Sequence, residues 1–116
     1  MAIERKEVGA RMSQAVIHGN TVYLAGVVAH NAGGKSMTEQ TKDVLASIDN
    51  LLKSAGTDKS KLLTTTIYIT DMAQFAEMNA VWDAWVSPGN TPARATVQAK
   101  LASPQYCVEI MVVAAR

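Results

Sequence analysis

Alternation of apolar and polar side chains predicts most of the strands in this chain. Two apolar runs surround Gly19 and Asn20, which favour the centre of a hairpin because both residues tolerate positive φ. The segment KLLTTTIYIT is rich in β-branched and aromatic residues, which favour strands. The strands predicted in this way cover about residues 14–18, 21–28, 62–70, 93–101 and 106–114.

A helical period of apolar side chains predicts two helices. Ser36 and Glu39 have the spacing of a capping box, and the apolar positions that follow recur at helical intervals until Gly56 ends the helix. Asp71 and Gln74 have the same capping-box spacing. They precede a second helix with an apolar face formed by Phe75, Met78, Trp82 and Trp85.

The predicted element order is ββαβαββ, in a single domain over residues 1–116. This order indicates an α+β sandwich, with two helices packed on one face of a mixed sheet. Two helices cover only one face, yet the segments VYLAGVV and VEIMVVAA are apolar on both alternating faces. We therefore expect self-association through the bare sheet face, the alternative being a slightly apolar free surface.

Composition narrows the choice of partners and compartment. The chain is 48% hydrophobic and 18% charged, with a net charge of +1 and no basic run, so we expect neither nucleic acid nor an anionic membrane as a partner. Its apolar runs are too short for a bilayer span and its N-terminus lacks a signal-peptide core, so we expect a cytoplasmic protein. One cysteine and two separated histidines predict neither an internal disulfide nor a zinc site.

Two charged residues in the last predicted strands are candidates for chemistry. Arg94 begins the polar face of the segment NTPARATVQAK, and Glu109 is the only charge in VEIMVVAA. If the four residues ASPQ close a regular hairpin, Leu101 faces Tyr106, and strand pairing puts Arg94 and Glu109 on one face of the sheet. The same face would then also carry Thr96, Gln98, Cys107, Met111 and Val113.

The residues themselves support two interpretations of this pair. If Ala93 and Val97 point to the helices, Arg94 and Glu109 lie on the face expected between subunits, where an unpaired charge is costly. The two could form a structural ion pair or lie at the wet rim of that interface. Alternatively they line a small-molecule pocket, because arginine holds a carboxylate through two hydrogen bonds and a carboxylate orients water or moves a proton. Cys107 would lie beside that pocket, as an inert thiol rather than a nucleophile.

Three parts of the chain carry a family resemblance that extends over essentially its whole length: GNTVYLAG, TTTIYITDMAQFAEMNAVWDAWV, and TPARATVQAKL followed by YCVEIMVVAA. These segments resemble the Rid family of reactive intermediate deaminases, also called the YjgF family and formerly L-PSP endoribonucleases. The resemblance implies a chorismate-mutase-like ββαβαββ fold. It also implies a homotrimer with sites in the clefts between subunits.

The family's activity, as the resemblance implies it, is hydrolysis of reactive enamines and imines, such as 2-iminobutanoate and 2-iminopropanoate, to 2-oxo acids and ammonia without metal or cofactor. The family's carboxylate-binding arginine falls on Arg94, and the acid that positions water falls on Glu109. Backbone groups at Gly26 and Thr96 would complete the cradle. Alternatives on the same fold are a non-catalytic module that binds a small carboxylate such as a 2-oxo acid, and the endoribonuclease, against which the balanced charge argues.

This chain departs from the family pattern at several positions. Many members carry a tyrosine near the start and a serine before the glycine, where this chain has Met12 and Ala25. Both changes remove hydrogen-bonding side chains from the expected substrate pocket. The segment ASPQYC has one residue more than shorter members, which suggests a bulge. The physiological imine and its pathway therefore stay open at the level of sequence.

Overall fold

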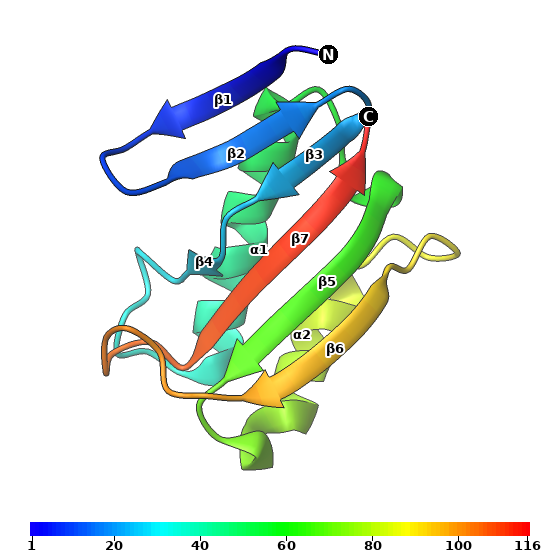
Figure 1. The fold of residues 1–116 in the computed structure, drawn as a ribbon. Helices are drawn as coiled ribbons and strands as arrows, with labels where there is room; N and C mark the ends of the chain where they lie inside the picture. Colours follow the sequence, from blue (N-terminus) through cyan, green and yellow to red (C-terminus); the bar gives the residue numbers. More distant parts are fainter.

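A single mixed sheet with two helices organises the chain, and the computed structural model describes all of residues 1–116 (Figure 1). Two short 3-10 turns, Lys59–Lys61 and Met72–Gln74, precede a strand and a helix respectively. The strands and helices are β1 (Ile3–Val8), β2 (Ser13–His18), β3 (Thr21–Leu24), β4 (Val27–Val28), α1 (Met37–Ser54), β5 (Leu62–Ile69), α2 (Phe75–Trp85), β6 (Ala93–Gln98) and β7 (Val108–Ala115).

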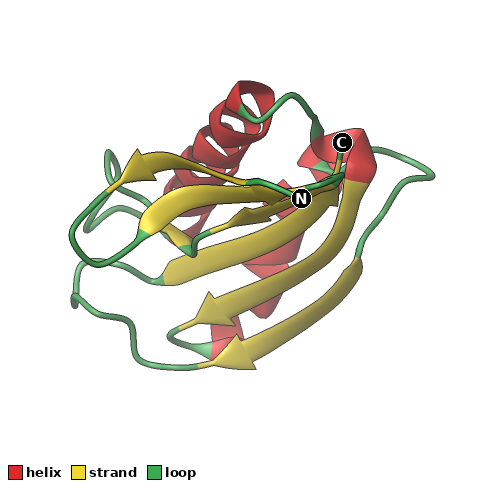
Figure 2. Cartoon of the chain, turned by 45° about the horizontal axis from the view of Figure 1, so that its top comes forward, coloured by secondary structure: helices red, strands yellow, loops and turns green.

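The strands follow the order β1-β2-β3-β7-β5-β6, and β4 pairs with β7 beyond the end of β3. Both helices lie on one side of the sheet, while the other side carries no helix (Figure 2). The core fills the space between, where α1 packs on β3, β4 and β7. The predicted α+β class and the uncovered sheet face are thus confirmed. None of the helices has the length and apolar character needed to cross a membrane.

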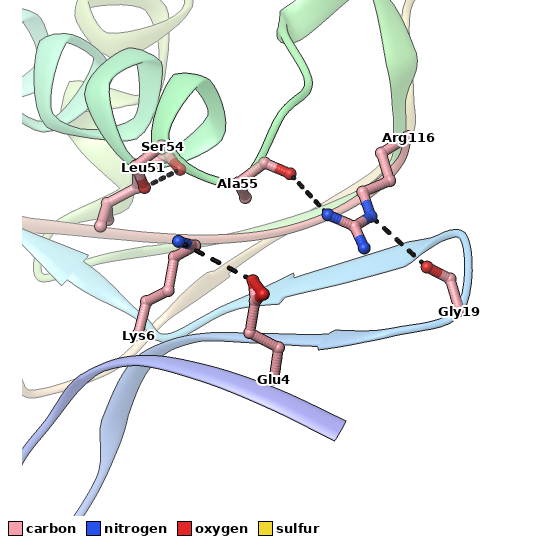
Figure 3. Close-up of polar contacts among 7 residues, drawn as sticks. All are labelled: Glu4, Lys6, Gly19, Leu51, Ser54, Ala55 and Arg116. Carbon is pink, nitrogen blue, oxygen red and sulfur yellow. Dashed lines mark hydrogen bonds and ion pairs between the residues drawn. The ribbon is translucent and has the colours of Figure 1, made fainter. Parts of the chain in front are cut away.

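Strand β1 was missed by the sequence analysis. Its sequence, IERKEV, is mostly polar and carries charges on both alternating faces, so the hydrophobic pattern gives no signal there. It pairs antiparallel with β2 at the edge of the sheet. Glu4 and Lys6 form an ion pair at 3.8 Å and project toward the C-terminal turn of α1 (Figure 3).

The predicted hairpin between the last two strands is wrong. Strand β6 runs parallel to β5, from the Thr64 to Ala93 pair to the Ile69 to Gln98 pair, and α2 provides the crossover that parallel neighbours need. Strand β7 lies on the other side of β5 and antiparallel to it. The segment 99–107 therefore passes the end of β5 instead of closing a tight turn. Local spacing alone could not reveal a strand inserted from earlier in the chain.

The N-terminus of α1 is satisfied by two separate side chains. Ser36 caps the helix as predicted, because its Oγ accepts a hydrogen bond from the Glu39 N–H at 3.2 Å. The backbone N–H and the hydroxyl of Thr38 both donate to Glu77 Oε2 on α2, each at 2.9 Å. A carboxylate from α2 therefore compensates the positive end of the α1 dipole and joins the two helices.

Gln40 ties the segment before β7 to α1. Its side chain is only 1% exposed, and all of its hydrogen bonds are to the backbone. Nε2 donates to the carbonyls of Lys35 at 3.0 Å and Gln105 at 2.8 Å, while Oε1 accepts from the Cys107 N–H at 2.9 Å. This amide thus helps to hold a long connection that has no regular structure of its own, together with the backbone bonds from the Gly34 N–H to the Gln105 carbonyl and from the Thr70 N–H to the Cys107 carbonyl.

Candidate active site

Glu109 projects from the centre of the uncovered sheet face. It lies opposite Val28 on β4 and Tyr68 on β5, both of which are partly exposed. The chain's only ion pair is Glu4 with Lys6, so the half-buried carboxylate of Glu109 has no charged partner within the chain. A carboxylate in this position is available to a ligand or to a water molecule.

Gly26 provides the space that the Glu109 carboxylate occupies. Between the Tyr23 to Val113 pair and the Val27 to Ile110 pair, the β3–β4 segment contains one residue more than β7 and forms a bulge. A Cβ on Gly26 would overlap Glu109 Oε2 and lie 3.0 Å from its Cδ. Only glycine lets the backbone approach the carboxylate so closely. The structure thus brings together the predicted site residues Gly26 and Glu109.

Arg94 lies on the other face of the sheet, so the prediction that it shares a face with Glu109 is wrong. It pairs with Thr65 of β5, which points into the core, and its Cζ lies 5.3 Å from the Trp82 ring centroid and 5.9 Å from that of Phe75. These distances are typical of cation–π contacts with α2. The error follows from the assumed hairpin, because β5 and not β7 is the strand beside β6.

The orientation of the remaining β6 residues is reversed for the same reason. Ala93 and Val97, which were expected to face the helices, lie on the uncovered face. Thr96 lies opposite the buried Ile67 on the helix side. Gln98 continues that row, and its Oε1 accepts a hydrogen bond from the Met72 N–H at 2.7 Å.

Cys107 is also directed away from Glu109. Its Sγ lies 3.9 Å from the Met37 sulfur at the start of α1, and its backbone N–H is bonded to Gln40. Burial raises the pKa of the Cys107 thiol, and the nearby Glu77 carboxylate adds to the rise. A thiol that resists ionisation is a poor nucleophile, which is consistent with the inert role predicted for it.

Comparison with known proteins identifies the family. The family model described as endoribonuclease L-PSP matches residues 3–116. The RutC family protein YoaB of Escherichia coli K12 is 48% identical over 115 residues, which cover 99% of each chain. A crystal structure of a YjgF family member from Neisseria meningitidis superposes with a TM-score of 0.96 at 46% identity, covering 100% of this chain and 96% of that one. This chain belongs to the Rid/YjgF family.

The wider Rid/YjgF family includes proteins named for an activity. The rat protein named 2-iminobutanoate/2-iminopropanoate deaminase is 28% identical over 107 residues, which cover 88% of this chain and 77% of that protein. The more similar relatives carry only the name of the RutC family. Family membership therefore extends over the full length of this Rid/YjgF protein, while the name of a reaction is carried only by its less similar relatives.

Two departures from the family pattern lie near the Gly26 bulge. Ala25 is half-buried in the bulge, and its N–H donates to the Gln14 carbonyl of β2 at 2.9 Å. Met12 lies in the turn between β1 and β2, two residues before Gln14, and is 48% exposed. In this Rid/YjgF protein the neighbourhood of the bulge therefore presents a methyl group and a thioether instead of hydroxyl groups.

A cavity of about 380 Å³ that was not predicted lies beside the segment 99–107. Lys100 provides its only charge, and the Gln40 side chain holds the segment through hydrogen bonds to the Gln105 carbonyl and the Cys107 N–H. The assumed hairpin left no room for such a cavity, and no local pattern of residues predicts it. The cavity is lined by Thr70, Lys100, Leu101, Ser103, Pro104, Tyr106 and Cys107.

Proposed function

We propose that this protein hydrolyses reactive imines and their enamine tautomers, derived from small 2-amino acids, to 2-oxo acids and ammonia. Family membership and the name of the rat relative support this reaction class. The observation that carries the proposal is Glu109, a carboxylate without a charged partner that lies against the backbone of Gly26 on an open surface. Such a group can hold a water molecule next to an electrophilic carbon.

The proposed chemistry needs few protein groups. Arg94 binds the substrate carboxylate, because a guanidinium presents two parallel N–H donors to it. Glu109 orients the water whose oxygen adds to the imine carbon while a proton reaches the nitrogen. Collapse of the resulting carbinolamine forms the C=O bond, breaks the C–N bond and releases ammonia. An imine carbon is already electrophilic, so positioning and charge stabilisation supply most of the catalysis.

The positions of Arg94 and Glu109 bear on where the site is built. They lie on opposite faces of one sheet, and their β5 partners, Thr65 and Tyr68, are three residues apart, or about 10 Å along the strand. Within one chain they do not converge on one small substrate in this arrangement. Our proposal therefore includes a homotrimer in which Glu109 of one subunit and Arg94 of a neighbour complete each site.

Measuring turnover tests the reaction. An amino-acid dehydratase generates 2-iminobutanoate in situ, and the rate of ammonia release is recorded with and without the purified protein. We expect acceleration by the wild type. Loss of the general acid–base group in Glu109→Gln should lower kcat by about 100-fold or more. Equal rates for the wild type and this variant would overturn the proposed function.

Mixed oligomers test the shared site. Arg94→Ala and Glu109→Gln are each expected to be inactive, but subunits unfolded together and refolded should regain activity. If each site takes its two groups from different subunits, an equal mixture supplies an intact Arg94 to half of the sites and an intact Glu109 to half of them. Roughly a quarter of the sites then have both groups. The two variants refolded separately and then combined serve as the control. No recovery in the co-refolded sample would contradict the inter-subunit site.

A binding module for 2-oxo acids is the second candidate, and the replacement of hydroxyl groups by Met12 and Ala25 favours it. Calorimetric binding of 2-oxobutanoate without any imine turnover would support this function over catalysis. We do not propose the endoribonuclease activity, because the net charge of +1 provides no basic surface for RNA.

A further inference from the structure

Three buried side-chain oxygens lack a hydrogen-bond partner, and they are the only three in the chain. They are Thr65 Oγ1, Asn79 Oδ1 and Thr96 Oγ1. All three belong to β5, α2 and β6, which are neighbours at one edge of the molecule (Figure 1). Buried polar groups without partners are uncommon and costly, so their concentration in one place calls for an explanation.

The three residues lie next to Arg94 in the fold, one on the neighbouring strand, one on the strand of Arg94 itself and one on α2. Thr65 is the direct β5 partner of Arg94 and is only 2% exposed. Thr96 follows Arg94 by two residues on the same face of β6. Asn79 lies four residues after Phe75 and three before Trp82, so it occupies the same strip of α2 as the two rings that the guanidinium contacts.

The hydrogen-bonding needs of these groups are complementary. A guanidinium has five N–H donors and no acceptor, while hydroxyl and amide oxygens accept. Arg94 has no carboxylate partner in the chain, because the only ion pair joins Glu4 and Lys6. The structure thus places three oxygens without donors on the strands and the helix next to one cation without an anion. In the present arrangement the guanidinium contacts the Trp82 and Phe75 rings and is not bonded to any of the three oxygens.

We propose that Thr65, Asn79 and Thr96 are positioning residues for Arg94. They accept hydrogen bonds from the inner N–H groups of the guanidinium when its outer edge binds a substrate carboxylate. The contact with the Trp82 and Phe75 rings is then a second, resting position of the guanidinium. This inference rests on the proposed role of Arg94 as the carboxylate-binding residue, and it assigns that residue a supporting set of acceptors.

The proposal predicts that stability and substrate affinity change in opposite directions in one variant. Thr65→Val has nearly the same shape but removes a buried hydroxyl that has no partner in the resting state, so its Tm should rise by a few degrees. The same change removes an acceptor from the bound state. KM for the imine should therefore rise about tenfold, with kcat changed far less, because this interaction supports ground-state and transition-state binding alike.

Thr41→Val is the matched control. Thr41 is equally buried, but its hydroxyl donates to the Met37 carbonyl of the same helix, α1, at 2.7 Å. Its replacement should lower Tm and leave KM unchanged. Asn79→Leu should raise KM as Thr65→Val does, and Arg94→Lys provides the reference for loss of the guanidinium. A Thr65→Val and Asn79→Leu double variant with wild-type KM would overturn the positioning role.

A binding measurement separates this proposal from the proposed reaction. Trp82 and Trp85 are the only tryptophans, so the Trp85→Phe protein reports on Trp82 alone. Titration with 2-oxobutanoate should change the Trp82 fluorescence as the guanidinium leaves the ring, and adding Thr65→Val should weaken the apparent affinity about tenfold. This result without imine turnover would support the positioning role and overturn the reaction. Imine turnover combined with an affinity that Thr65→Val does not change would support the reaction and overturn the positioning role. If the protein shows no turnover and no fluorescence response, both proposals are overturned.

Discussion

The space beside Gly26 determines how Glu109 is held. In Gly26→Ala the new Cβ displaces the end of a flexible side chain, so the fold should survive with only a small change in Tm. The carboxylate would move away from its position on the bulge, and a displacement of this kind should lower kcat by about 10- to 100-fold. Gly33→Ala is the matched control, because its Cβ would crowd the Gln105 side chain at 3.0 Å instead of Glu109. Full activity of Gly26→Ala would show that Glu109 tolerates displacement.

Cys107 allows a test of burial at a single residue. Because its pKa is raised, less thiolate is present at a given pH in the folded chain than in the unfolded chain. Alkylation by iodoacetamide at pH 8 should therefore be slower in the native protein than in urea. The same shift stabilises the fold below the pKa of the unfolded thiol, and that contribution is lost as the pH rises through the folded pKa. Equal alkylation rates would contradict the raised pKa.

At the scale of the elements, the individual helices and strands were more predictable than their pairing. The Ser36 cap and the apolar periodicity that follows located α1, and alternation located five of the strands. Asp71 caps a short 3-10 turn through the Ala73 N–H instead of forming the expected capping box with Gln74. Arg94 was assigned to the wrong face because the side chains that share its face depend on which strand pairs with β6. That pairing is decided by contacts between residues far apart in the sequence.

The hydrogen bonds between the Gln40 side chain of α1 and the 99–107 segment can be tested by mutation. Gln40→Ala removes three hydrogen bonds and leaves the Cys107 N–H without a partner, while the Gln105 carbonyl keeps the bond that it accepts from the Gly34 N–H. We expect the free energy of unfolding to fall by about 2 to 4 kcal/mol, measured by urea denaturation. Hydrogen exchange should accelerate at the Cys107 amide, while the β5 amides of the core remain protected. Unchanged exchange at Cys107 would show that the segment holds its path without this amide.

At the scale of the whole molecule, the uncovered sheet face is the main unexplained surface. Large apolar side chains remain exposed on it, including Tyr23 at 46%, Val97 at 41% and Met111 at 39%. A charge placed at its centre should oppose association of subunits. We predict that Met111→Glu runs as a monomer of 12.4 kDa in size-exclusion chromatography with light scattering, and that the wild type forms a larger species.

Met72→Glu is the control for this prediction. Met72 is also 39% exposed, but it lies in the 3-10 turn before α2 and not on the uncovered face. This variant should keep the oligomeric state of the wild type. If the wild type is itself a monomer in solution, the proposed site shared between two subunits is contradicted.

The position of β7 between β3 and β5 also bears on biosynthesis. This central strand comes later in the sequence than every strand it joins, so earlier segments emerging from the ribosome cannot complete the sheet. Until β7 is synthesised, the β1–β3 and β5–β6 groups leave open edges beside apolar faces, which are prone to aggregation. A nascent chain arrested before Val108 should therefore depend on chaperones, whereas a chain released after Ala115 can fold as one cooperative unit.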